Sequence, residues 1–242
     1  MERSTILLLI AVISCIMASP VSAGTWSDGF EDGNLDEWEL AFKDGPTTFR
    51  AENGELRMEV HSWSVSMLCV VGSDQWKDYT VRVKVKILKI FGIAVDGGII
   101  IRLNKPRPRN YYYFFIADEW QGSAYPGVPP EGEGAFAFPQ INDQAQRGKV
   151  KVFTPELDHW YTLKAIAQDK HTEFYLDDEL VGEFGYAELR SGSVGLVVSN
   201  ALVHFDDLVV TGPDIPDGGP GVVSFSVRPK DKLAAVWGKL KQ

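Results

Sequence analysis

The chain has 242 residues, with 33 acidic and 24 basic side chains and a formal net charge of −9. An acidic chain repels nucleic-acid phosphates and anionic lipid headgroups, so neither is expected as a partner. Two cysteines are too few for a fold held together by several disulfides.

Residues 1–23 have the features of a signal peptide. A short apolar run precedes Val21-Ser22-Ala23, a small-x-small cleavage site. Because the run is too short to span a bilayer, we expect a secreted or extracytoplasmic chain that is not an integral membrane protein. Lipoprotein processing at Cys15 is the alternative. Cleavage after residue 23 leaves Cys69 as a lone thiol, expected to be a small buried hydrophobe.

Short strands separated by turns are expected through the first half of the body. Residues 79–87 alternate almost perfectly between apolar and polar side chains, which indicates a half-buried strand. Asn53-Gly54 is the strongest hairpin signal. Further strands are expected at 64–71, 97–103, 110–116 and 149–153. Residues 117–150 are rich in Gly and Pro, and we interpret them as a long irregular loop of the kind that often carries function.

The most regular pattern runs from residue 158 to residue 211. Residues 159–167 alternate with a period of two, and polar turns at 168–170 and 177–179 separate them from two further short strands. Strands at 193–198 and 202–210 follow. No window between them has a helical stripe, so the region predicts an antiparallel meander.

Several phrases in this region resemble one known superfamily. They are WYTLK at 160–164, FYLDDELV at 174–181, SGSVGL at 191–196 and HFDDLVV at 204–210, with FEDGNLDEW at 30–38 near the start. Together they look like concanavalin A-like lectin/glucanase domains, which include laminin-G-like modules. The resemblance implies an all-β fold, a two-sheet antiparallel β-sandwich of jelly-roll type, over residues 24–212.

A change of composition follows this domain. Residues 213–221 form a Pro- and Gly-rich linker, and residues 222–242 form a short tail with a basic end. The tail is too short to be a domain. We expect it either to dock on the sandwich or to act as a tag for export machinery.

Catalytic residues are hard to find in the sequence. Glycoside hydrolysis needs two carboxyl groups facing one bond, and catalytic members of the superfamily carry a strand of Glu-x-Asp-x-x-Glu type that we do not find. Asp118 and Glu119 are weak candidates because they adjoin the long loop. The four histidines are interpreted as ordinary strand or turn residues. The chain is therefore expected to be a binding protein rather than an enzyme, and a glycoside hydrolase if it is one.

A sugar-binding surface is easier to build. Sugars stack their apolar faces on aromatic rings and direct their hydroxyls to polar partners. Tyr111 and Tyr113 share one face of a strand, whereas Tyr112 points to the other. The candidate ligand-binding residues are Arg102, Asn110, Tyr111, Tyr113, Asp118 and Trp120. The alternative is that these tyrosines fill the core between the sheets.

A structural calcium ion is implied by the resemblance, because related domains join an N-terminal loop to an acid on the last strand. The matching residue of the last strand is Asp206, and the early ligand is Asp28 or Glu31. Carboxylate oxygens suit a hard cation. The alternative for Asp206 is a hydrogen-bonded acid that binds no ion.

These observations favour a secreted carbohydrate-binding or adhesion module whose partner is a polysaccharide or another glycan. A carbohydrate-active hydrolase of the same fold is the first alternative, and an extracellular protein-interaction module is the second. The oligomeric state stays open.

Overall fold

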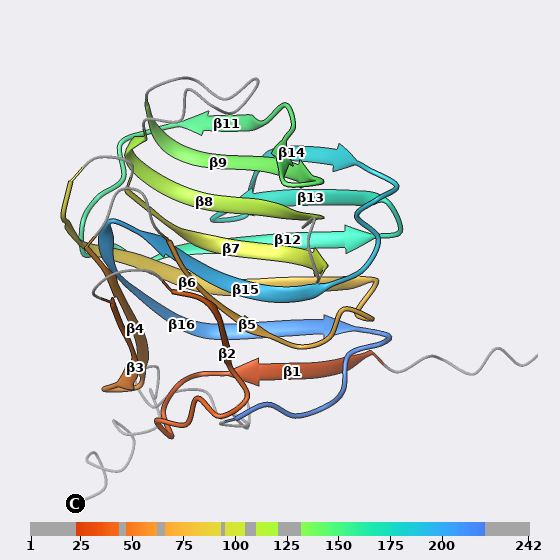
Figure 1. Ribbon diagram of the computed structural model, residues 1–242, viewed down its shortest axis with the longest axis horizontal. Helices are drawn as coiled ribbons and strands as arrows, with labels where there is room; N and C mark the ends of the chain where they lie inside the picture. Colours follow the sequence, from red (N-terminus) through yellow and green to blue (C-terminus); the bar gives the residue numbers. More distant parts are fainter. Residues whose placement is uncertain are drawn as a thin grey trace, which may run out of the picture.

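The computed structural model describes residues 23–43, 47–61, 66–92, 95–104, 110–120 and 132–220, with backbone only for Ser66, Met67, Val95, Glu119 and Trp120. In this part of the chain all regular structure is β-strand, arranged as two antiparallel sheets (Figure 1). It contains no helix long and apolar enough to cross a membrane. The expected signal peptide and the basic tail lie outside the described residues, and the predicted domain boundaries stay predictions.

Sheet A has the strand order β14-β13-β12-β6-β16-β4-β3, and β1 also pairs with β16. Its strands are β1 (Gly24–Asp28), β3 (Thr47–Glu52), β4 (Glu55–Val60), β6 (Tyr79–Ile90), β12 (Tyr161–Gln168), β13 (His171–Leu176), β14 (Glu179–Gly185) and β16 (Ala201–Gly212). The predicted meander is confirmed for β12, β13 and β14, which are neighbours in this sheet, whereas β16 pairs with β6 and β4, and residues 193–199 belong to the other sheet.

Sheet B has the order β10-β9-β8-β7-β15-β5-β2, and β11 also pairs with β9. Its strands are β2 (Glu39–Phe42), β5 (Ser66–Val71), β7 (Val95–Asn104), β8 (Asn110–Trp120), β9 (Gly132–Ile141), β10 (Gln144–Ala145), β11 (Lys149–Val152) and β15 (Ser193–Ser199). The all-β sandwich expected from the sequence is thus confirmed.

The main core fills the space between the two sheets. Strand β6 contributes Val81, Val83 and Val85, all fully buried, and β15 contributes Leu196 from the opposite sheet. Alternation places these apolar side chains inward and the intervening Arg82 and Lys84 outward. Cys69 belongs to this core as predicted, and burial holds the pKa of its thiol far above the usual range.

The hairpin between β3 and β4 has the predicted turn. Asn53 and Gly54 both adopt positive φ angles, 56° and 76°. Two such residues in succession are what a tight hairpin turn requires, and Asn-Gly adopts them with little strain. The turn fixes the register in which Glu52 lies opposite Glu55.

The long irregular loop predicted for residues 117–150 needs correction. Residues 132–141 form β9, which pairs with β8 on one side and with β10 and β11 on the other. The alternating residues 135–138 behave as a strand despite Pro139, a residue usually confined to strand edges and ends. Residues 121–131 lie outside the described part of the chain.

Candidate functional site

The outer face of sheet B, which points away from sheet A, is apolar and aromatic. Rings from β8 and β9 contact one another there: the centroids of Tyr113 and Phe115 are 4.3 Å apart, those of Phe115 and Phe136 are 5.4 Å apart, and Phe138 lies 5.4 Å from Tyr113. We call this surface the aromatic face. Its buried members are Leu68, Val70, Ile100, Leu103, Tyr113, Phe115, Ala117, Phe136, Phe138 and Val197.

The three consecutive tyrosines of β8 divide between the faces as predicted. Tyr112 packs in the core between the sheets, where its ring lies 5.7 Å from that of Phe174. Tyr111 and Tyr113 belong to the aromatic face instead. The alternative, that the tyrosines fill the core, therefore holds for Tyr112 alone. Tyr113 is only 8% exposed and Tyr111 is half-buried, so the face is not an open platform.

The buried carboxyl group of Asp96 lies at one end of the aromatic face. Asp96 is on β7, four residues before Ile100 and on the same side of the strand, and it pairs with Ser199 of β15. It is 3% exposed. Ser199 bonds it through its side chain and its backbone, the Tyr113 hydroxyl also contacts it, and its Oδ1 atom has no hydrogen-bond partner among the described residues.

Burial decides the protonation of this group. Desolvation raises the pKa of Asp96 from 3.8 to about 7, against the opposing effect of the neighbouring Tyr113 hydroxyl and of the hydrogen bonds from Ser199. A carboxyl group with this pKa gains and loses its proton near neutral pH. That property suits proton transfer in a reaction.

Gly98 makes room for this arrangement. It lies on β7 between Asp96 and Ile100, and a Cβ atom placed on it would be 2.4 Å from Cβ of Phe115 and 2.3 Å from the backbone oxygen of Phe114. Without a side chain at this position, the rings of β8 can lie across β7. The glycine therefore permits the contact between Tyr113 and Asp96.

A cavity of about 350 Å³ lies at the other end of the aromatic face. Three of its residues carry carboxyl groups, Glu37, Glu39 and Asp74, and Ser193 of β15 also lines it. Ser193 and Ser199 are six residues apart on one strand, so roughly 20 Å separate this cavity from Asp96. No sequence motif distinguishes these three acids from other surface carboxyl groups.

Arg102, predicted as a ligand contact, faces the protein interior. Its side chain is fully buried, and its guanidinium donates hydrogen bonds to the backbone oxygens of Leu189 at 2.5 Å, Lys77 at 3.3 Å and Asp169. Its φ angle of 53° departs from the strand conformation and interrupts the alternation of β7. The guanidinium therefore ties loops together and is not presented to a ligand.

The other predicted contacts spread along β8. Asn110 accepts a hydrogen bond from the backbone N–H of Asn142 at 2.6 Å, which fastens the end of the β8–β9 hairpin. Asp118 is partly buried beyond Ala117 and lies opposite Val95 of β7. For Glu119 and Trp120 the side chains lie outside the described part of the structure.

The three acids predicted to bind calcium do not converge. Asp28 points into the core, where its two carboxyl oxygens accept hydrogen bonds from Trp38 Nε1 and the Phe30 N–H, each at 2.8 Å. Asp206 is buried on β16, at 4% exposed, and it pairs with Lys84 of β6. Glu31 is exposed beside Gly54. Among the described residues these acids do not form a group of three ligand atoms within 4.8 Å, so their carboxylates alone do not supply the six to eight oxygens of a calcium site, and calcium stays a prediction.

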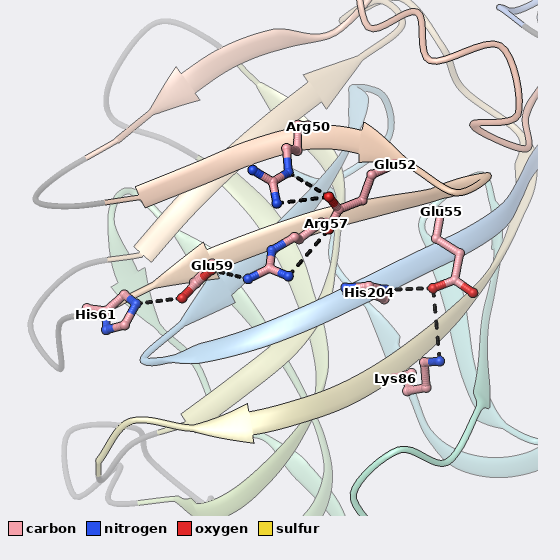
Figure 2. Close-up of polar contacts among 8 residues, drawn as sticks. All are labelled: Arg50, Glu52, Glu55, Arg57, Glu59, His61, Lys86 and His204. Carbon is pink, nitrogen blue, oxygen red and sulfur yellow. Dashed lines mark hydrogen bonds and ion pairs between the residues drawn. The ribbon is translucent and has the colours of Figure 1, made fainter.

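The outer face of sheet A is charged where that of sheet B is aromatic. Figure 2 shows a ladder of ion pairs across β3, β4, β16 and β6. Arg57 binds Glu52 at 3.3 Å and Glu59 at 2.5 Å, and His204 Nδ1 lies 2.6 Å from Glu55. Every acid drawn has a basic partner. This part of the face therefore resembles a solvated, neutralised surface.

The sequence does not predict Asp96 as a site residue, because the apolar pattern places the start of the strand at Gly97. The structure begins β7 at Val95 and places Asp96 inside it. The available signal was a lone carboxyl group next to an apolar run that extends to Ile101. An acid in such a run is costly to bury, so it merits attention as a site residue.

Solved structures share this fold. The carbohydrate-binding module CBM66 from Bacillus subtilis matches with 17% identity and a TM-score of 0.53, over 74% of this chain and 98% of that one. A Bacillus licheniformis β-glucanase matches with 14% identity and a TM-score of 0.56, over 78% and 98%. The laminarinase catalytic domain of Thermotoga petrophila RKU-1 matches with 11% identity and a TM-score of 0.54, over 78% and 97%.

The fold therefore defines the class: this chain is a concanavalin A-like β-sandwich, an architecture used by carbohydrate-binding modules and glucanases. Residues 25–211 match the family described as the 3-keto-alpha-glucoside-1,2-lyase-like domain, and the chain belongs to that family. No curated protein matches the chain. At these identities the solved structures establish the fold, and function has to be argued from the site.

Proposed function

We propose that this chain is a carbohydrate-active domain that cleaves a 3-keto glycoside at the aromatic face, with Asp96 as the group that transfers the proton. The observation that carries the proposal is Asp96 itself, a buried carboxyl group with a raised pKa and an Oδ1 atom that has no partner among the described residues. Leaving such an atom unpaired costs free energy, and proteins retain costly groups of this kind at functional sites.

The chemistry suggested by the family description needs one acid–base group. In a 3-keto glycoside the carbonyl makes the hydrogen on C2 acidic. The Asp96 carboxylate takes this proton, the C–H electron pair forms the C1–C2 double bond, and the bond from C1 to the glycosidic oxygen breaks. The carboxylic acid then returns the proton to the departing alkoxide, so no further reactant is required.

Three features of Asp96 and its surroundings support these steps. Its pKa of about 7 lets the same group act first as a base and then as an acid near neutral pH. Removal of the C2 proton places negative charge on the C3 carbonyl oxygen of the sugar. We propose that the Tyr113 hydroxyl, which lies beside Asp96, donates a hydrogen bond to this oxygen. Tyr111, the half-buried ring of the aromatic face, offers apolar surface on which a sugar can stack.

The test is to incubate the full chain with p-nitrophenyl 3-keto-α-glucoside and to follow the release of p-nitrophenol. We expect release by the wild-type protein and none from the matched glucoside with a 3-hydroxyl group, because only the ketone acidifies C2. Equal rates on both glycosides would contradict the elimination. No release from either would contradict the enzymatic proposal.

A lectin-like activity without cleavage is the second candidate. It is favoured by the half-buried Tyr111 at the edge of the aromatic face. A glycan array run with calcium and again with a chelator tests this candidate together with the expectation of calcium. Binding of unmodified glycans that is lost in Tyr111→Ala would support it, whereas an array without signal would remove it.

We also propose that the chain is exported and that residues 1–23 are removed as a signal peptide. N-terminal sequencing of the mature protein tests this: a first residue at Gly24 would support it, and a retained Met1 would contradict it.

A further inference from the structure

A second group of chemically reactive side chains lies on the outer face of sheet A, far along the sheet from the ion-pair ladder. His171 and Glu173 come from β13 and Glu183 comes from β14, the edge strand. Thr172 and Phe174 are buried in the sheet's inner side, so alternation turns His171, Glu173 and Tyr175 outward. This group takes no part in the function proposed above.

The ligand atoms of the three residues converge. His171 Nε2 lies 3.1 Å from Glu173 Oε1 and 3.7 Å from Glu183 Oε2, and one ligand atom from each residue lies within 4.8 Å of the others. Donor atoms around one tetrahedral zinc ion lie roughly 3.3 Å apart, given bonds of about 2.0–2.2 Å. The spacing thus needs only small side-chain adjustments to surround an ion.

The charges of this group are not balanced as they are elsewhere on the same face. Glu173 lies directly opposite Glu183, and like charges opposite each other destabilise a strand pair. Glu52 and Glu55 form the same kind of pair in the ladder, but Arg50 and Arg57 bind the first of them, and Lys86 lies 3.9 Å from the second. Among the described residues, the basic partner of Glu173 and Glu183 is the single histidine His171.

One carboxylate is also held in position. The Tyr175 hydroxyl donates to Glu173 Oε2, which leaves Oε1 directed at His171. Metal-binding carboxylates are commonly oriented in this way by a hydrogen bond to the other oxygen. All three ligands are accessible, with side chains that are 49%, 29% and 62% exposed for His171, Glu173 and Glu183.

We propose that His171, Glu173 and Glu183 bind a divalent transition-metal cation. One imidazole nitrogen and two carboxylate oxygens match the preferences of Zn²⁺, and water fills the fourth position. The ion neutralises the opposed glutamates and clamps the edge strand β14 to β13. It acts on the stability of this hairpin, separately from chemistry at the aromatic face.

The test is a Zn²⁺ titration of the metal-free full chain by calorimetry, with Co²⁺ absorption as a second readout of coordination. We expect one saturable equivalent and a melting temperature that rises with Zn²⁺, since a ligand that binds the folded state stabilises it. His171→Ala and Glu183→Gln should each weaken the affinity by about tenfold or more. Tyr175→Phe, which frees the carboxylate without removing a ligand, should weaken it by about tenfold.

The matched control is His61→Ala. His61 also lies beside a glutamate on this face, 2.7 Å from Glu59, but there Arg57 neutralises the carboxylate. We expect wild-type zinc affinity in this variant. The proposal is overturned if no saturable equivalent binds, if His171→Ala and Glu183→Gln retain wild-type affinity, or if His61→Ala loses as much affinity as His171→Ala.

Discussion

The outer faces of the two sheets differ in chemistry: that of sheet A carries paired charges, and that of sheet B carries buried aromatic rings. Sheet A exposes a ladder in which each drawn acid meets a base, so its charges are solvated and neutralised in pairs (Figure 2). Sheet B buries rings on its outer face, with the buried carboxyl group of Asp96 at one end of them. An exposed pair contributes little to stability and carries little information about function. A buried acid without full pairing is costly, so the second face is where function should be sought.

The largest expected effect comes from truncating the centre of the aromatic face. Phe115→Ala removes a fully buried ring that contacts three other rings, and it should lower the free energy of unfolding by about 3–5 kcal/mol. Leu180→Ala on sheet A is the control. The Leu180 side chain is 53% exposed, so its removal should change the free energy of unfolding by less than about 0.5 kcal/mol. Denaturant unfolding measures both. If the two variants lost the same free energy of unfolding, the aromatic face would contribute no more to stability than an exposed position on sheet A.

The pH dependence of stability should report on Asp96. Because its pKa rises from 3.8 to about 7 on folding, the folded chain keeps a proton that the unfolded chain releases. The free energy of unfolding should therefore fall as pH rises from about 4 to 7, by at most about 1.4 kcal/mol per pH unit from this group. Asp28, with a pKa of about 6 raised by burial, acts in the same direction at lower pH.

The window between pH 6 and 7 separates the two acids. In Asp96→Asn the free energy of unfolding should fall less between pH 6 and pH 7 than in the wild type, as measured by denaturant unfolding at pH 6 and at pH 7. Asp28→Asn should flatten the fall mainly below pH 6. A slope in Asp96→Asn identical to that of the wild type would show that this carboxyl group does not titrate as described.

A smaller effect is expected for Gly98→Ala. The added Cβ atom would meet Phe115 and the backbone of Phe114, so overpacking should cost about 1–3 kcal/mol. Gly185→Ala on sheet A is the matched control, because no described atom lies within 4 Å of the position that a Cβ atom would take there. If thermal melts of the two variants coincide, the rings of β8 do not depend on the gap at Gly98.

The smallest effect is expected on the charged ladder. Arg57→Ala removes two ion pairs at a side chain that is 23% exposed, and it should cost about 1 kcal/mol or less. The difference from wild type should shrink further in 1 M salt, because mobile ions screen exposed charges. A loss above about 3 kcal/mol that persists in salt would mean that the ladder is as important as the aromatic face.

The sequence predicts local alternation better than it predicts partners. The strands from β12 to β16 and the turn at Asn53-Gly54 follow from side chains that are neighbours in the chain, and the structure confirms them. Strand β9 was missed because Pro139 and the flanking glycines are typical of loops, whereas pairing with β8 and β11 holds the segment extended. Tertiary pairing overrode the local signal.

Only those features of the site that follow from strand alternation can be predicted from the sequence. The split of Tyr111 and Tyr113 from Tyr112 follows from the period of two, and it is correct. The positive φ of Arg102 breaks that period, so its inward position could not be derived from alternation. The environment of Asp96 depends on Ser199, which is 103 positions later in the chain, and no local pattern connects the two.

We expect the buried carboxyl group of Asp96 to transfer the proton in the proposed cleavage. The most direct measurement compares wild type with Asp96→Asn in the release of p-nitrophenol from p-nitrophenyl 3-keto-α-glucoside, with circular dichroism to verify that both proteins fold. Loss of a positioned acid–base group should lower the rate by about 10²- to 10⁴-fold. A folded Asp96→Asn protein that releases p-nitrophenol at the wild-type rate would contradict the account.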